Sequence, residues 1–431
     1  MDSGWLLSIG LLICALLEAP LFVIIAAASI YSYYSLDQDF SSIETIIIEL
    51  NRLSTMPVLM ALPLFTLAGC ILTKSQAPKR IMNFMHALLG WLPGGLGVAA
   101  LCSCAFFTAL TGASGVTIVA LGGILYPILI QKGYQQSFTL GLLTTSGSRG
   151  LLFPPSLPII LYGVVSQLSI DSIYKAALAP GLLMIFVVAL YIIFFEMSCN
   201  KNRAMPDNTN GAMQVKLLPS LKEACWDLPI IGIIILGVYG GFTTVSEISV
   251  IVVTYIVLVY CFIKKEISWK KDLSELIAEA TILSGSIIVI LGFALGFTGF
   301  LVLEEVPQML LEKITEFTQN KFLFLAGLNV FLLFVGCIMD IFSAIIIIVP
   351  IIAPIATEYG IHPIHLCIIF LCNLEIGYST PPVGINLFIA SLKFNKPVTD
   401  LYKASLPYLA LLILVLLAIT YIPLISTFTL N

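Results

Sequence analysis

The chain has 431 residues, of which 59% are hydrophobic and only 10% are charged, and its mean hydropathy is +1.06. This composition excludes a soluble globular domain, and a net charge of −4 provides no basic domain for binding nucleic acid. Apolar runs of about 18 residues or more are long enough to cross a membrane as helices. The sequence therefore predicts an all-α polytopic membrane protein.

The predicted membrane segments follow one another along almost the whole chain. The first has neither a basic region before it nor a small-residue cleavage site, so we expect a retained helix rather than a signal peptide. A polar stretch at 198–226 is expected to be a cytoplasmic linker, and amphipathic stretches at 76–92 and 303–319 are expected to lie flat as connecting arms. The apolar segments are 5–34, 55–73, 94–131, 137–168, 175–197, 227–243, 246–263, 281–301, 322–357, 364–392 and 403–427.

Four of these segments are too long or too interrupted for one plain helix. The segments at 94–131 and 322–357 carry polar or small residues near their centres, "TALTGASG" and "GCIMDIFS", which predicts two re-entrant hairpins. The segments at 137–168 and 364–392 break at "SGSRGLLFPPS" and "EIGYSTPPVG". Because paired prolines interrupt helices, we expect each of these two to be a single crossing made of two half-helices.

The distribution of basic residues tests this topology, because Lys and Arg accumulate in short cytoplasmic loops. With two hairpins and a cytoplasmic N-terminus, 15 of the 20 basic residues fall on the cytoplasmic side. Plain crossings in place of the hairpins scatter the charges over both sides. We therefore predict a cytoplasmic N-terminus and a periplasmic C-terminus. The other five basic residues are Arg149, within the membrane, and Arg52, Lys175, Lys313 and Lys321 on the opposite side.

The two halves of the chain repeat a pattern of prolines and glycines. Tyrosine-containing motifs "YKAALAP" and "YKASLP" recur at an offset of 228. This predicts a first repeat at 1–197 and, after the linker, a connecting helix and second repeat at 227–431. The connecting helix inverts the second copy, and inverted repeats with paired broken helices are typical of secondary transporters. At an offset of 227, Pro127, Gly133, Pro154 and Pro155 are matched by Pro354, Gly360, Pro381 and Pro382.

The broken helices could bind cations. Prolines leave carbonyl groups of the preceding turn unpaired, which is costly in hydrocarbon unless a partner is supplied. Sodium ions take carbonyl and hydroxyl oxygens, so each break predicts one cage; the alternative is that the prolines only kink the helices for packing. The first cage would use the carbonyls of Gly150 and Phe153 with hydroxyls of Thr108, Thr111 or Ser114. The second would use the carbonyls of Gly336, Gly377 and Val383 with the hydroxyl of Thr380.

Two ionisable residues are predicted at membrane depth, where such residues are usually functional. Asp340 lies at the tip of the second hairpin and could bind substrate hydroxyl or ammonium groups, or attract cations; alternatively it lies near the surface of a shallow hairpin. Arg149 could bind a substrate carboxylate with two hydrogen bonds. It could instead pair with Asp340 or Glu375, or face a water-filled vestibule.

Several of these motifs together resemble one known family, the large membrane subunit of tripartite ATP-independent periplasmic (TRAP) transporters. They are "LPLFTLAGCIL", "TGASGVTIVALGGILYPILIQKGY", "GLLFPPSLPIILYG", "MDIFSAIIIIVPIIAPIA" and "NLEIGYSTPPVGINLF". The resemblance implies an elevator-type transporter in the bacterial inner membrane that takes up an organic acid, of the sialic acid or C4-dicarboxylate class, with sodium. It also implies two partners, a periplasmic substrate-binding protein and a small four-helix membrane subunit. No ATP-binding motif is found, and no organic cofactor is expected.

The family's binding positions fall on particular residues of this chain. The resemblance implies substrate contacts from Ser114, Ser156 and Asp340. Family members usually have a serine at the position of Ala113, and a glycine and an aliphatic residue at those of Ser146 and Arg149, so Arg149 is the best candidate for a feature peculiar to this chain. The implied sodium ligands are Thr108, Thr111, Gly150, Phe153 and Pro155 in the first cage and Gly336, Gly377, Thr380 and Val383 in the second.

Two other functions remain open from the sequence. One is a stand-alone divalent-anion/sodium symporter of the same superfamily, which would need no binding protein. The other is an intramembrane enzyme, such as a lipid-linked transferase, but the chain offers no cluster of a catalytic base or metal ligands at an interface. Since no small subunit precedes Met1, we expect that subunit to be a separate chain, with membrane lipid around both.

Overall fold

A computed structural model describes residues 21–37, 44–200 and 217–430. Every regular element in these ranges is a helix, and eight of the described helices are long and apolar enough to cross a membrane. The prediction of an all-α multi-pass membrane protein is therefore confirmed. The start of the predicted first segment, up to residue 20, and residues 201–216 of the predicted linker lie outside the described residues.

The first half contains a helical hairpin and an interrupted helix. The hairpin turns at Gly112, whose φ of +66° lies in the left-handed region that glycine adopts without steric cost. In chain order the elements are α2 (Leu21–Asp37), α3 (Glu44–Ser54), η2 (Pro57–Met60), α4 (Ala61–Lys74), α5 (Ala77–Leu89), α6 (Gly95–Thr111), α7 (Ser114–Thr117), η3 (Ile118–Gly122), α8 (Gly123–Gln131), α9 (Gln136–Ser146), α10 (Leu157–Ser166) and α11 (Ile170–Asn200).

The second half also contains a hairpin, with its tip at Met339 and Asp340, followed by an interrupted helix. The elements are α12 (Leu217–Ala224), α13 (Leu228–Gly240), α14 (Val245–Val257), η4 (Leu258–Ile263), α15 (Asp272–Leu303), α16 (Val306–Phe317), α17 (Lys321–Ile338), α18 (Ile341–Glu358), α19 (Pro363–Gly377), α20 (Ile385–Phe394), α21 (Val398–Tyr421), α22 (Leu424–Thr427) and η5 (Phe428–Leu430).

The two interruptions lie at the stretches where the sequence places breaks. Residues 147–156, the first break, separate α9 from α10, and residues 378–384, the second break, separate α19 from α20. Prolines lack the N–H that would continue a helix, and each break contains a Pro–Pro pair, Pro154–Pro155 and Pro381–Pro382, both with a cis peptide. The breaks therefore expose backbone groups in the interior of the helical bundle.

One predicted segment begins earlier than expected. Helix α15 starts at Asp272 rather than near residue 281. Acidic residues in its first turn, Asp272 and Glu275, stabilise the amino-terminal end of the helix. Both carboxylates also lie 3.3 Å from the Nζ atom of Lys74 at the end of α4. Hydropathy alone misses this charged turn, because it measures only the apolar part of the helix.

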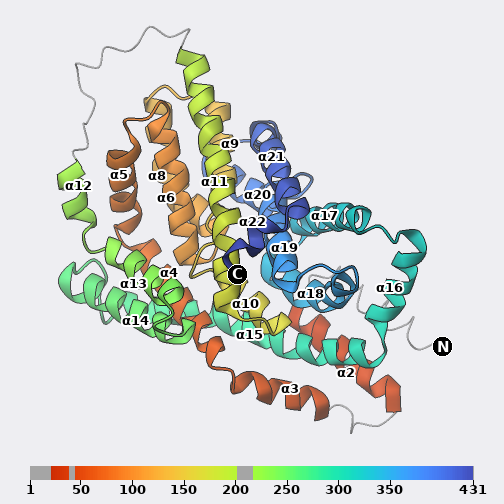
Figure 1. Ribbon diagram of the computed structural model, residues 1–431. Helices are drawn as coiled ribbons and strands as arrows, with labels where there is room; N and C mark the ends of the chain where they lie inside the picture. The colour runs from red at the N-terminus through yellow and green to blue at the C-terminus, as the bar shows by residue number, and fades with distance from the viewer. Residues whose placement is uncertain (1–20, 38–43, 201–216, 431) are drawn as a thin grey trace.

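The helices form two groups. Helices α2, α3 and α4 pack against α15, and α4 also packs against α14, which pairs with α13. Figure 1 shows α15 running below α10 and α18, with α2 and α3 beneath it. The other group contains the hairpins and interrupted helices together with the long helices α11 and α21. We refer to these as the outer group (α2–α4 and α13–α15) and the hairpin group (α6–α11 and α17–α22).

Corresponding contacts recur in the two halves of the hairpin group. Helix α6 packs on α9 as α17 packs on α19, and α9 packs on α21 as α19 packs on α11. The second halves of the interrupted helices cross over: α10 packs on the second hairpin arm α18, while α20 packs on η3 of the first hairpin. Each hairpin is therefore held between its own interrupted helix and that of the other half.

Two short helices connect the groups. Helix α5 leads from α4 to α6, and α16 leads from α15 to the second hairpin and packs on α18. Their ranges overlap the two predicted amphipathic arms. Each arm thus has one end joined to the outer group and the other joined to a hairpin.

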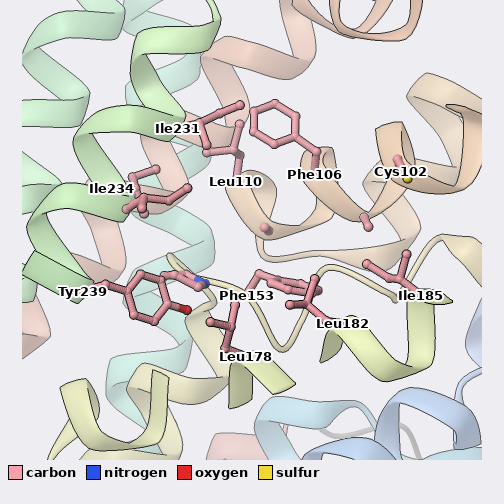
Figure 2. A pocket seen from close by; sticks show the side chains of 14 residues that line it. Cys102, Phe106, Leu110, Phe153, Leu178, Leu182, Ile185, Ile231, Ile234 and Tyr239 are labelled. Atoms are coloured by element: carbon pink, nitrogen blue, oxygen red, sulfur yellow. The ribbon is translucent and has the colours of Figure 1, made fainter. Parts of the chain in front are cut away.

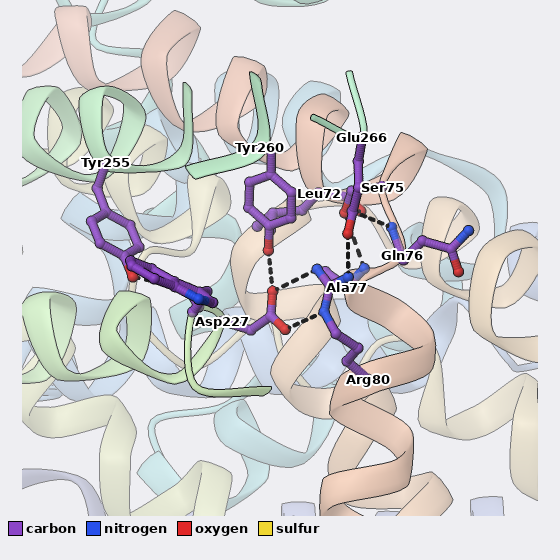
Figure 3. Close-up of polar contacts among 10 residues, drawn as sticks. Leu72, Ser75, Gln76, Ala77, Arg80, Asp227, Tyr255, Tyr260 and Glu266 are labelled. Atoms are coloured by element: carbon purple, nitrogen blue, oxygen red, sulfur yellow. Dashed lines mark hydrogen bonds and ion pairs between the residues drawn. The ribbon is translucent and has the colours of Figure 1, made fainter. Parts of the chain in front are cut away.

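The first arm is anchored by a buried charge cluster (Figure 3). Arg80 on α5 donates to both carboxylate oxygens of Asp227, at 2.7 and 3.0 Å, and to Oε1 of Glu266 at 2.5 Å. Tyr260 donates its hydroxyl to Asp227, and Oε2 of Glu266 accepts from the backbone N–H of Gln76 at 2.9 Å. Burial disfavours the charge of Arg80, but its hydrogen bonds to the two carboxylates outweigh this and raise the pKa of Arg80. The start of the arm is therefore attached to the loops that flank α13 and α14.

Candidate functional site

The first break lies directly against the first hairpin. A Cβ atom at Gly150 would lie 2.1 Å from the carbonyl oxygen of Ala105 and 2.4 Å from the backbone nitrogen of Ala109, so only glycine fits there. Beside this contact, the Thr108 hydroxyl lies 2.7 Å from both the carbonyl oxygen of Gly147 and the Thr117 hydroxyl. The break and α6 thus bring two hydroxyls and several carbonyls together without exposure to solvent.

The second break makes a similar contact with the second hairpin. A Cβ atom at Gly377 would lie 2.7 Å from the Cα and carbonyl carbon of Gly336. The backbone N–H of Gly384 donates to the carbonyl of Cys337 at 2.9 Å, and that of Val383 donates to the Cys337 sulfur at 3.3 Å. These contacts hold the backbone of the break along the end of α17.

The structure brings some of the predicted sodium ligands together more closely than others. Thr108 and Gly150 are in contact, since a Cβ on Gly150 would lie 2.7 Å from Cβ of Thr108. Thr111 lies at the end of α6, where its hydroxyl is 3.4 Å from the carbonyl oxygen of Ala113. The carbonyl of Phe153 accepts from the backbone N–H of Ser156 at 3.0 Å, while the predicted ligand Pro155 is buried within the break.

In the second cage, Gly336 and Gly377 are in contact, whereas Val383 lies at the rim with 38% of its surface exposed. The Thr380 hydroxyl donates to the carbonyl of Ile376 at 2.9 Å and is only partly buried. A hydroxyl that donates in this way keeps its oxygen lone pairs available to a cation. Thr380 therefore has the right chemistry for the proposed role, at the more open of the two breaks.

An apolar cavity lies on one side of the first break (Figure 2). Its volume is about 290 Å³, and its walls come from α6, the first break, α11 and α13. The ring of Phe153 points into it beside Leu182, with Tyr239 on the opposite side. No charged side chain of the described ranges lines this cavity, so these residues do not provide a site for an organic anion. Its position between α13 of the outer group and the hairpin group marks a place where the two groups are incompletely packed.

The predicted substrate contacts have different surroundings. Ser114, at the tip of the first hairpin, donates its hydroxyl to Oδ1 of Asn386 at the start of α20 over 2.8 Å. Ser156, at the end of the first break, is fully buried, and its hydroxyl has no hydrogen-bond partner among the residues that the structure describes. Asp340 caps α18: its Oδ1 accepts from the backbone N–H groups of Phe342 and Ser343, each at 2.9 Å.

Several buried polar atoms close to the breaks have no hydrogen-bond partner in the described residues. They include the hydroxyls of Ser146, Ser156 and Ser379 and the side-chain nitrogen of Asn386. Nη1 of Arg149 and both carboxylate oxygens of Glu375 also have no hydrogen bond, although Nη1 and Oε1 form an ion pair at 3.2 Å. Buried polar groups without partners are rare and usually mark a ligand or water position. Each of these residues lies within a break or at a helix end next to one, which makes the breaks the candidate binding region.

The prediction of Arg149 as a substrate contact does not match this structure. Its side chain is only 1% exposed, and its Nη1 atom lies 3.2 Å from Oε1 of Glu375, which is equally buried. Pairing with Glu375 was one of the alternatives left open by the sequence. Because the guanidinium is enclosed and already forms an ion pair with Glu375, it is not available for a two-pronged contact with a substrate carboxylate.

Sequence reasoning missed the tyrosines that hold the breaks. Tyr174 on α11 donates its hydroxyl to the carbonyl of Ser156 at 3.1 Å, and Tyr402 on α21 donates to the carbonyl of Pro382. The hydroxyl oxygen of Tyr378 accepts a hydrogen bond from the backbone N–H of Ile341, next to the tip of the second hairpin, at 2.5 Å. The repeated "YKA" motif was the available signal, since it places Tyr174 and Tyr402 at equivalent positions.

Comparisons with known proteins cover almost the full chain. Residues 8–425 match the family described as "Tripartite ATP-independent periplasmic transporter, DctM component". The chain is 32% identical to the isethionate TRAP transporter permease protein DctMQ of Oleidesulfovibrio alaskensis, with 97% of this chain and 69% of that protein covered. It is 33% identical to the C4-dicarboxylate TRAP transporter large permease protein DctM of Pseudomonas aeruginosa, with 89% of each covered. In fold it resembles the crystal structure of the YdaH transporter of Alcanivorax borkumensis, with a TM-score of 0.64, 15% identity and 89% of each chain covered.

Proposed function

This chain belongs to the family of DctM components of tripartite ATP-independent periplasmic transporters, and we propose that it carries an organic acid across the bacterial inner membrane in symport with sodium. It is a transporter component and not an enzyme. In the proposed system a periplasmic binding protein delivers the substrate, and a small four-helix membrane subunit completes the membrane part.

The proposal is carried by one observation: each break lies against its own hairpin through a glycine, and the two glycines, Gly150 and Gly377, are 227 positions apart. Together with the recurring helix contacts, this supports two repeats that are inverted in the membrane, with the hairpins re-entrant and the binding sites between their tips and the breaks.

Sodium is the proposed coupling ion because the breaks supply hard oxygen ligands. In the first cage, the hydroxyl of Thr108 and the carbonyls around Gly150 are gathered where water has little access. In the second, Thr380 contributes a hydroxyl next to the Gly336–Gly377 contact. Binding of the ions would hold each break against its hairpin and so complete the substrate site.

An elevator movement is the proposed mechanism of translocation. The hairpin group would move as a unit against the outer group. The chain passes between the two groups through the arms α5 and α16 and through the stretch from α11 to α13 that contains α12, and the remaining contacts between them are side-chain packing. Arg80 holds the start of α5 against Asp227 and Glu266, which flank α13 and α14 of the outer group, so the far end of α5 is the part expected to follow the hairpin. This assigns the anchored arm end to the fixed part of the transporter.

The substrate is proposed to be an anion of the C4-dicarboxylate or sialic acid class. The two relatives named above are similar to this chain in identity, 32% and 33%, yet their names refer to isethionate and to C4-dicarboxylates. Overall identity therefore does not select one anion. Ser114, Ser156 and Asp340 are the proposed contacts. Asn386, whose side-chain nitrogen has no hydrogen-bond partner among the described residues, lies next to Ser114 and accepts its hydroxyl.

The experiment is uptake into proteoliposomes that contain this chain and its small subunit, with the binding protein and a radiolabelled C4-dicarboxylate or sialic acid outside. We expect uptake to require an inward sodium gradient and to stop when choline replaces sodium. Equal uptake with and without the gradient contradicts sodium coupling. Uptake by the chain without the binding protein instead favours the alternative, a stand-alone sodium/anion symporter.

A further inference from the structure

Arg149 lies where the ends of two half-helices meet. It follows α9 by three residues, and its partner Glu375 lies in the last turn of α19. The Nε atom donates to the carbonyl of Thr145 at 3.0 Å, and Nη2 donates to the carbonyl of Glu375 at 3.4 Å and to the Ser148 hydroxyl at 3.2 Å. The guanidinium is therefore surrounded by oxygen atoms from both interrupted helices.

The two carbonyls need this partner because of how the helices end. In a continuous helix, the carbonyl of Thr145 would accept from the N–H of Arg149, but that N–H bonds to Ser146 instead, at 3.3 Å. In the same way, the N–H of Ser379 bonds to the carbonyl of Ile376 at 3.0 Å rather than to that of Glu375. Each of these two carbonyls has thus lost its usual helical N–H donor. Arg149 donates to both, and the Glu375 carbonyl also accepts from the Ser148 hydroxyl at 3.2 Å.

The charge of Arg149 also suits this position. The carboxyl end of a helix carries a partial negative charge, and two such ends meet here together with the carboxylate of Glu375. Both residues are 1% exposed, so the negative charge is not screened by water. A buried carboxylate without a cation is strongly unfavourable, so the ionised form of Glu375 favours a positive charge at this junction.

We infer that the guanidinium of Arg149 serves as a built-in cation that joins the two breaks. Without this side chain, an external monovalent cation would have to occupy the same position. Arg149 is a positioning residue: it holds the ends of α9 and α19 together through backbone oxygens and Glu375. Removing its side chain leaves four oxygens around an enclosed space, namely the carbonyls of Thr145 and Glu375, the Ser148 hydroxyl and the Glu375 carboxylate. Such a hard oxygen set accepts sodium.

The test compares Arg149→Ala with Arg149→Lys in the purified full-length chain. The melting temperature is measured across a range of sodium chloride concentrations, with choline chloride keeping the ionic strength constant. We expect Arg149→Ala to melt lower than the parent in choline and to gain more than the parent from each tenfold rise in sodium, because a ligand that binds only the folded state stabilises it. Arg149→Lys keeps the charge and is expected to respond to sodium as the parent does.

A sodium response of Arg149→Ala equal to that of the parent overturns the inference. If this variant does not fold, the double variant Arg149→Ala/Glu375→Gln replaces it, because it removes both charges and leaves the carbonyls. A melting temperature of the double variant equal to that of the parent in choline then overturns the inference. A sodium response larger than that of the parent supports the inference. Lys79→Ala, on the exposed side of α5, controls for the loss of a positive charge.

The consequence for transport rests on the proposed sodium-coupled uptake. In proteoliposomes, we expect the Hill coefficient for sodium to rise by about one in Arg149→Ala, since one more ion must bind. Sodium coupling and the role of Arg149 are tested by different results. If neither the stability nor the uptake activity of the parent protein depends on sodium, the proposed coupling is wrong. The difference between Arg149→Ala and Arg149→Lys in the melting experiment still decides the role of Arg149.

Discussion

Replacing Arg80 by alanine should separate the first arm from the outer group. Arg80 is the only side chain seen to bridge both carboxylates in the described cluster, Asp227 and Glu266. The side chain of Asp227 is 0% exposed, so the substitution leaves a carboxylate in a dry environment with the Tyr260 hydroxyl as its remaining side-chain donor. Glu266 is less affected, because its side chain is 16% exposed and it keeps the N–H of Gln76.

The magnitude follows from the buried pair. Removing one partner of a buried ion pair costs about 3–5 kcal/mol. With an unfolding entropy of about 2.1 cal/mol/K per residue, a chain of 431 residues has about 0.9 kcal/mol per kelvin, so each kcal/mol lowers the melting temperature by about 1 °C. Arg80→Ala should therefore melt about 3–5 °C below the parent.

The assay is thermal unfolding of the purified chain in detergent, with Lys79→Ala as the matched control. Lys79 precedes Arg80 on the same helix and carries the same charge but is exposed, so its removal should change the melting temperature by less than about 1 °C. Equal shifts in the two variants would refute the reasoning, because they would mean that the buried cluster contributes no more than an exposed charge. Arg80→Lys should recover only part of the loss, since an ammonium cannot reproduce the two-pronged contact with Asp227.

Three further predictions concern the breaks. Asp340→Asn should keep the cap on α18 and the melting temperature but lose uptake, whereas Asp340→Ala should lose uptake and about 1 kcal/mol of stability; normal transport by Asp340→Asn removes the charge from the site. Gly377→Ala should abolish uptake and lower the melting temperature, because its Cβ would meet the Gly336 backbone, while Gly232→Ala, with nothing within 4 Å, serves as the control and should behave like the parent. Thr380→Val should raise the sodium concentration for half-maximal uptake, and an unchanged sodium dependence counts against the second cage.

Much of the fold could be predicted from hydropathy and from the positions of glycine and proline. Apolar length identified the long helices, and the paired prolines at 154–155 and 381–382 located both interruptions, because a missing N–H ends a helix whatever surrounds it. The early start of α15 was missed because its first turn is charged, and charged turns look like loops on a hydropathy scale. The short helix α3 was missed for a similar reason, since it is amphipathic rather than apolar.

The candidate site was only partly predictable. The sequence named the glycines at the breaks, and the structure gives their reason: the backbone of the hairpin approaches so closely that no Cβ fits at Gly150 or Gly377. It could not identify Asn386 as the partner of Ser114, because the two are 272 residues apart and no periodicity connects them. The capping of α18 by Asp340 was also not anticipated, although an aspartate before an apolar helix is a common start signal.

Composition and spacing by themselves determined that this chain is a membrane protein with two interrupted helices, because length, apolarity and missing N–H groups act locally along the chain. Its family resemblance followed from the same motifs. Only the tertiary structure decided what the charged residues do. The sequence left several partners open for Arg149 and assigned none to Arg80, which follows Lys79 in an amphipathic stretch. Folding places Glu375 beside Arg149, and Asp227 and Glu266 beside Arg80. In a dry interior a charged side chain is stable only next to an opposite charge or hydrogen-bonding groups such as carbonyls.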